Sequence, residues 1–142
     1  MEEQILIPDP GPKRPPLLTI LCILTFIGSG MGFIGFMGVA LQYEATIEAL
    51  KVIYADFPEA SYLLNAPHKF FVIATILMGA SLLGAIFMWN LKKIGFHIYA
   101  SAQIIYLILP FIFFNGEANP LLNVITTALF VYLYARNLPI MR

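Results

Sequence analysis

Charged side chains are scarce in this chain. Of its 142 residues, 11% are Asp, Glu, Lys or Arg, whereas about a quarter of the residues in a typical soluble domain are charged. The eight basic and eight acidic residues balance to a formal net charge of zero, so the chain offers no overall attraction to nucleic acid. So few charges could not cover the surface of a soluble globule of this size, which excludes a soluble fold.

The chain also lacks the residue combinations from which most catalytic and metal sites are built. Its single cysteine, Cys22, excludes an intrachain disulfide and a cysteine-based zinc site. His68 and His97 fall on opposite sides of the membrane in the topology that the basic residues indicate, so they cannot share a metal ion. No serine in the apolar stretches has a candidate base nearby, and a working nucleophile needs one within hydrogen-bonding reach. The sequence therefore predicts no catalytic residue, no cofactor and no bound metal, and a protein that is not an enzyme.

Ionisable groups at membrane depth are almost absent as well, and a transporter driven by ions or protons usually needs one there. His97 is the exception, about one turn inside its apolar stretch. Gln103 is the other strongly polar side chain of that stretch, but six residues separate the two, so they face different directions on a helix. We expect an interhelical hydrogen bond for Gln103 and an interfacial position for His97.

Apolar residues, in contrast, make up 60% of the chain and are gathered in four long stretches. These stretches cover residues 17–41, 70–89, 94–114 and 118–135. About 20 apolar residues span the hydrocarbon core of a bilayer, so the first three are long enough and the fourth is at the lower limit. The sequence therefore predicts an all-α integral membrane protein, a four-transmembrane-helix bundle with an amphipathic helix in the outer loop 42–69.

The basic residues indicate how the bundle is oriented. Residues 1–16 form a Pro-rich leader that we expect to be disordered, followed by a membrane domain over 17–142. Six of the eight basic residues lie in the leader, the turn 90–93 and the tail, and only Lys51 and Lys69 lie in the outer loop. Because Lys and Arg resist translocation, both termini and the turn are predicted to be cytoplasmic. The cell inner (plasma) membrane is the expected location, with an organelle membrane as the alternative.

The outer loop begins with an amphipathic segment. Plotted at 100° per residue, its apolar side chains share one side and its charged ones the other. The apolar side consists of Tyr43, Ile47, Leu50, Ile53, Tyr54 and Phe57. Pro58 should end or bend this helix. The segment either continues the first span outward or lies on the membrane surface, and the sequence does not choose between the two.

Glycines in the first apolar stretch are the most specific feature of the chain. They are Gly28, Gly30, Gly32, Gly35 and Gly38. Three of them, at 28, 32 and 35, share one stripe of a helix, and small residues let two helices approach closely in lipid. We interpret this stripe as packing within the bundle against Ala74, Ser81, Gly84 and Ala85, a face of small residues on the second span. Gly30 and Gly38 point elsewhere, which favours a second contact with a partner helix.

These features favour a non-catalytic function. We expect an accessory or scaffolding subunit that is surrounded by membrane lipids and docks through its glycines and outer helix. The partner would be a larger membrane protein assembly or a second copy of the chain. The alternative is a passive channel or small-molecule carrier, which could be a homo-oligomer. A membrane enzyme is the third hypothesis.

Overall fold

The computed structural model describes residues 13–115 and 120–142, and these residues form helices without any strand. The helices are α1 (Pro16–Leu41), α2 (Tyr43–Ile53), α3 (Ser61–Leu64), α4 (His68–Trp89), α5 (Lys93–Phe114) and α6 (Leu121–Arg136), with short 3-10 helices η1 (Pro58–Ala60) and η2 (Leu138–Ile140). Helices α1, α4 and α5, and α6 together with η2, are long and apolar enough to cross a membrane. This confirms the prediction of an all-helical chain with four helices of transmembrane length.

The helix bounds follow local sequence signals. Pro16 begins α1, because proline fits the first position of a helix, where its missing N–H is not needed. Asn115 ends α5 in the left-handed region, with φ of 48°, a conformation that asparagine tolerates better than most residues. Most of the leader, at 1–12, and the start of the predicted fourth stretch, at 118–119, lie outside the described residues.

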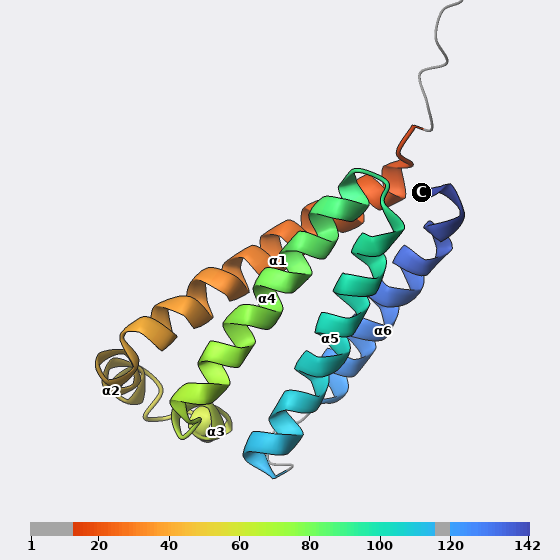
Figure 1. The fold of residues 1–142 in the computed structure, drawn as a ribbon. Coiled ribbons are helices and arrows are strands. Elements are labelled where there is room, and N and C mark those ends of the chain that lie inside the picture. Colours follow the sequence, from red (N-terminus) through yellow and green to blue (C-terminus); the bar gives the residue numbers. More distant parts are fainter. Residues whose placement is uncertain (1–12, 116–119) are drawn as a thin grey trace, which may run out of the picture.

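The four long helices run side by side in the order α1, α4, α5, α6 (Figure 1). The first described residues, the turn between α4 and α5, and the C-terminal segment lie at one end of the bundle, here called the terminal end. Helices α2 and α3 lie at the other end, here called the loop end. This arrangement brings 13–16, 90–93 and 137–142 together, although they are far apart in the sequence.

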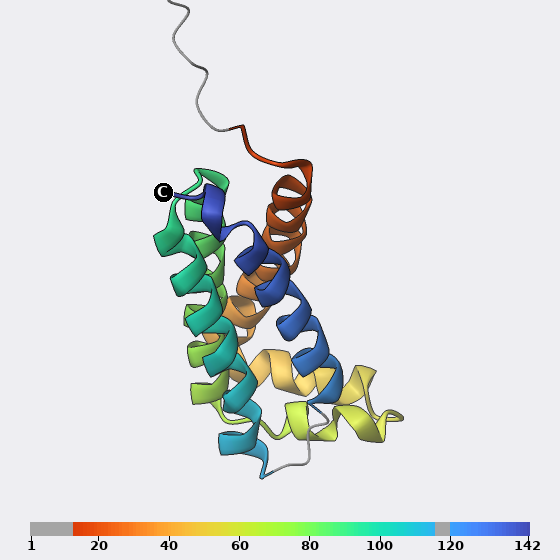
Figure 2. The same ribbon diagram turned by 90° about the vertical axis from the view of Figure 1, so that its right-hand side faces the viewer.

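Helix α2 does not extend α1. The chain leaves the helical conformation at Gln42, with φ of −128° and ψ of 51°, and α2 then lies across the long helices (Figure 2). Two hydrogen bonds hold this elbow: the Nε2 of His68 bonds the carbonyl of Ala40 at 2.6 Å, and the hydroxyl of Tyr43 donates to the carbonyl of Ala66 at 2.6 Å. The first of these satisfies a carbonyl at the C-terminus of α1, which has no partner within its own helix.

The interior consists of two apolar clusters with polar side chains between them. The cluster at the loop end is built on Phe70, Phe71 and Ile47, and the cluster at the terminal end on Leu18, Met88 and Tyr134. Between the two, Ser29 and Ser81 are buried about halfway along α1 and α4.

The backbones of α4 and α5 approach each other closely at Gly84 and Gly95. A Cβ added to Gly84 would lie 2.8 Å from the carbonyl oxygen of Gly95 and 2.8 Å from the backbone nitrogen of Tyr99. A Cβ added to Gly95 would collide with the carbonyl oxygen of Gly84 and lie 2.6 Å from the nitrogen of Met88. Only glycine fits at both positions, because backbone atoms cannot move aside as a flexible side chain can.

We predict that Gly84→Ala destabilises the bundle by about 1–3 kcal/mol, the usual cost of overpacking. The matched control is Gly30→Ala, where an added Cβ meets nothing within 4 Å. That variant should be neutral or slightly stabilising, because alanine is about 1 kcal/mol more favourable than glycine in a helix. Thermal unfolding in detergent micelles measures both. Equal midpoints for the two variants would contradict the close approach of α4 and α5.

Candidate functional site

A groove between α1, α5 and α6 is lined by residues of all four long helices and has a volume of about 370 Å³. We call it the lateral groove. Its lining includes Thr25, Gly28 and Gly32 from α1, Met78 from α4, Tyr99, Gln103 and Tyr106 from α5, and Thr126, Thr127 and Phe130 from α6. These side chains are apolar or polar without charge, so the groove can offer hydrogen bonds but no ionic contact.

Gly28 and Gly32 of the glycine stripe line this groove. Gly28 and Gly35 do not pack against α4, so our interpretation of bundle packing is wrong for these two glycines. An added Cβ at either of these positions would meet nothing within 4 Å. Gly32 alone approaches α4, where its Cβ would lie 3.1 Å from the Sδ of Met78. Gly30 and Gly38 also face open space, as expected from their position away from the stripe.

A neighbouring face of α1 makes the contact with α4. The hydroxyls of Ser29 and Ser81 form a hydrogen bond of 2.9 Å, and the thiol of Cys22 donates to the carbonyl of Ala85 at 3.8 Å. Further along, the ring of Phe33 rests on Gly79, whose added Cβ would lie 3.2 Å from it. At this point the small residue belongs to α4 and the large side chain to α1, whereas we expected small residues on both helices.

Ser81 joins three helices. Besides its bond to Ser29 of α1, its hydroxyl accepts a hydrogen bond from the Nε2 of Gln103 of α5 at 3.0 Å. The interhelical role expected for Gln103 is thereby present, and its side chain lies at the edge of the lateral groove. Nothing in the spacing of these three residues along the chain indicated that they would meet.

Helix α6 is attached to the bundle through its second half. The hydroxyls of Tyr134 and Thr25 of α1 bond at 2.7 Å, and the Tyr134 ring packs edge-on against Tyr99 of α5 with centroids 4.9 Å apart. The first half is different. Leu122, Val124 and Ile125 are all exposed, Leu122 by 75%. The lateral groove thus opens beside a stretch of α6 that the described chain leaves largely uncovered.

The apolar side of α2 divides into two parts. Ile47 is 6% exposed in the loop-end cluster, and the Tyr43 ring packs on His68 and Phe71. The remainder stays accessible: Leu50, Tyr54 and Phe57 line a hollow of about 410 Å³ with residues of η1 and α3, while Ile53 is exposed beside them. Of the residues predicted to contact a partner, Tyr43 and Ile47 are therefore used in internal packing, while Leu50, Tyr54 and Phe57 remain accessible.

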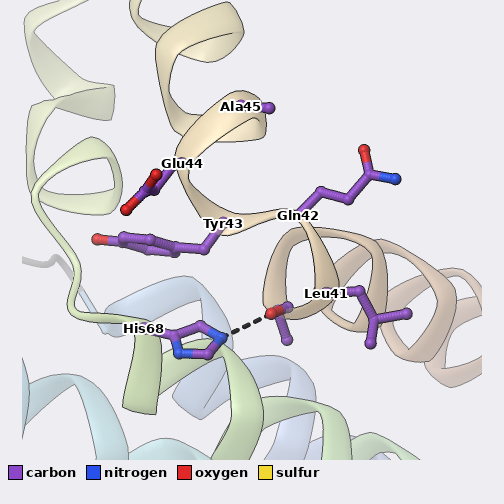
Figure 3. A pocket seen from close by; sticks show the side chains of 7 residues that line it. Leu41, Gln42, Tyr43, Glu44, Ala45 and His68 are labelled. Atoms are coloured by element: carbon purple, nitrogen blue, oxygen red, sulfur yellow. Dashed lines mark hydrogen bonds between the residues drawn. The ribbon is translucent and has the colours of Figure 1, made fainter.

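A second hollow at the loop end surrounds the elbow between α1 and α2. Figure 3 shows His68 pointing toward the last turn of α1, with the ring of Tyr43 beside it and Glu44 and Gln42 turned away from the imidazole. Because the Nε2 of His68 is bonded to a backbone carbonyl, this side chain acts as a helix cap. His97 lies elsewhere, exposed on α5 in a shallow depression lined by residues of α4 and α5.

Within residues 13–115 and 120–142, no group of three or more His, Cys, Asp or Glu side chains is placed to hold a metal ion. What the lateral groove can do is accept apolar groups and form a small number of hydrogen bonds.

We predict that Ser81→Ala lowers the free energy of unfolding by about 1 kcal/mol, because it removes two interhelical hydrogen bonds of modest individual worth. The control is Ser101→Ala on α5, where the serine is exposed and no hydrogen bond of its side chain is seen. Unfolding of both variants by a denaturing detergent, followed by circular dichroism, gives the comparison. A Ser81→Ala variant as stable as wild type would show that the three-helix link contributes nothing.

The comparisons with known proteins add no family: no family profile, no curated protein and no solved structure matches this chain.

Proposed function

We propose that the protein is a non-catalytic accessory or scaffolding subunit, which receives a transmembrane helix of a partner protein in the lateral groove. The observation that carries this proposal is the lateral groove beside Leu122, Val124 and Ile125, which the described residues leave exposed. Helices in lipid associate through close packing at small residues and through hydrogen bonds between helices. Gly28 supplies the small residue, and Gln103 and Thr127 supply uncharged polar groups.

A partner helix suits this groove better than lipid alone. Acyl chains pack on large apolar side chains as well as on small ones, so they do not need a glycine on the floor of a groove. A helix backbone gains van der Waals contact only where the opposing residue is small. Side chains of the partner could then reach Gln103 and the threonines of α6, which lie at the same depth as the groove.

The membrane placement is part of the proposal. The four long helices span the cell inner membrane, and the terminal end, with six basic residues, faces the cytoplasm. Helix α2 then lies in the outer interface with its charged side toward water. Its orientation across the spans and the exposure of Ile53, Tyr54 and Phe57 support this, because an interfacial helix lies in the membrane plane with its apolar side buried.

We predict that a cysteine introduced as Ser61→Cys reacts with an impermeant thiol reagent in intact cells, and that one introduced as Pro139→Cys does not. Both positions are exposed, and both variants are made with Cys22→Ala to remove the native thiol. Permeabilised cells provide the control, since both cysteines should react there. Labelling of position 139 but not 61 in intact cells would reverse the orientation.

We predict that Gly28→Leu releases the partner while leaving the isolated chain as stable as wild type. The leucine would fill the lateral groove, and overpacking of about 1–3 kcal/mol corresponds to roughly 5- to 150-fold weaker binding. Gly38→Leu is the matched control, because it is equally open to an added side chain but does not line the groove. Co-purification and native mass spectrometry in mild detergent measure what remains bound.

The same experiment separates the alternatives. A homo-oligomer that dissociates in Gly28→Leu would make the partner a second copy of the chain. If Gly28→Leu retained every bound protein, or if wild type carried none, the groove would not be a docking site. A solute flux in liposomes that Gly28→Leu abolishes would favour the passive carrier instead.

A further inference from the structure

Charge is segregated between the two ends of the bundle. Six cationic side chains lie at the terminal end: Lys13, Arg14, Lys92, Lys93, Arg136 and Arg142. The acidic side chains of the described residues lie at the loop end, on α2 and the segment that follows it: Glu44, Glu48, Asp56 and Glu59. Those of the leader, Glu2, Glu3 and Asp9, fall outside the described residues.

Backbone hydrogen bonds hold three of these cations together. The N–H of Arg142 donates to the carbonyl of Leu91 at 2.7 Å, and the N–H of Lys93 donates to the carbonyl of Arg142 at 2.8 Å. Leu91 has a φ of 58°, which makes the turn tight and places Lys92 between the two bonded positions. The side chains of Lys92, Lys93 and Arg142 therefore project, all exposed, from one short stretch of paired backbone, here called the basic rim.

Arg14 extends the positive charge next to the basic rim. Its guanidinium lies 3.5 Å above the ring centre of Trp89, and its Nη1 donates to the Trp89 carbonyl at 2.9 Å. No Asp or Glu side chain of the described residues lies at this end, and these like charges repel one another. An anion bound among them would relieve that repulsion.

The surface next to the basic rim is apolar. Ile94, the residue after Lys93, is 55% exposed, and Ile86, one turn before the end of α4, is 46% exposed. A ligand that matches both surfaces must carry an anionic group and hydrocarbon. Phosphate groups of lipids lie at the level where transmembrane helices end, and clusters of Lys and Arg at this level bind anionic headgroups.

We propose that the basic rim binds an anionic phospholipid, with the phosphate among Lys92, Lys93 and Arg142 and the acyl chains along the exposed isoleucines. Phosphate accepts charge-assisted hydrogen bonds from both ammonium and guanidinium groups. The proposal rests on membrane insertion, which is part of the proposed function, but not on the accessory role.

The test is lipid retention by the full chain in mild detergent, followed by native mass spectrometry. Phosphatidylglycerol and phosphatidylcholine are added in equal amounts. We expect wild type to retain mainly phosphatidylglycerol, and the triple variant Lys92→Gln, Lys93→Gln, Arg142→Gln to lose it. Each charge near a membrane surface is worth roughly fivefold in affinity, so the loss should be at least about tenfold.

Two controls make the result specific. The double variant Lys51→Gln, Lys69→Gln removes cations at the loop end and should retain as much phosphatidylglycerol as wild type. The triple variant Lys92→Arg, Lys93→Arg, Arg142→Lys keeps the charge and should retain as much phosphatidylglycerol as wild type. Thermal unfolding of each variant checks the fold, which these exposed side chains should not affect.

Inorganic phosphate added as a competitor distinguishes a lipid from a free anion. We expect it not to displace phosphatidylglycerol at equal concentration, because it lacks the acyl chains. Complete displacement would overturn the lipid proposal in favour of a simple anion site. Equal retention of the two lipids by wild type, or equal losses in the triple variant and the loop-end control, would also overturn it. A failure to find a partner protein would leave this result unaffected.

Discussion

The close approach of α4 and α5 at Gly84 and Gly95 is the contact around which the other helices are arranged. In lipid the hydrophobic effect does not drive helices together, so association depends on close van der Waals packing and interhelical hydrogen bonds. The tight turn at 90–92 connects the two helices, and the glycines allow their backbones to meet. Helix α1 packs on another side of α4, and Ser81 lies between the two contacts, because its hydroxyl bonds both Ser29 of α1 and Gln103 of α5. Helix α4 is therefore the central helix of the bundle.

The position of α1 has a consequence for the lateral groove. Because α1 meets α4 through Cys22, Ser29 and Phe33, Gly28 and Gly35 of its glycine stripe are turned out of that contact. Helix α6 is held to α1 at Tyr134, which bonds Thr25, and no described residue outside α1 lies within 4 Å of a Cβ added to Gly28 or Gly35. The groove thus arises from the same packing that holds the bundle together. The two hydrogen bonds of the Ser81 hydroxyl also fix how α1, α4 and α5 are positioned along their axes, because a shift of one helical turn would break both bonds.

The two ends of the bundle differ in how they are closed. At the terminal end, backbone pairing of Arg142 with the α4–α5 turn gathers cations beside Trp89. At the loop end, the His68 cap and the Tyr43 hydroxyl hold α2 across the bundle. A basic end suits a surface of phosphates, whereas an end with acidic and apolar side chains suits an interface with water.

The sequence by itself determined the four long helices, their bounds to within a few residues where described, and the separation of basic from acidic ends. Each helix depends on the composition of a single stretch, because a backbone in hydrocarbon must satisfy its own hydrogen bonds and therefore forms a helix. The separation of charge follows from the even number of stretches, which places the leader, the turn 90–93 and the tail at one end. Only the tertiary structure decided which face of α1 meets α4, why Gly84 pairs with Gly95, and that α2 turns aside at Gln42. A helix that is apolar all round carries no periodic signal for its packing face. Which face of a helix packs depends on how the surfaces of two helices fit together. The sequence of either helix alone does not contain this information.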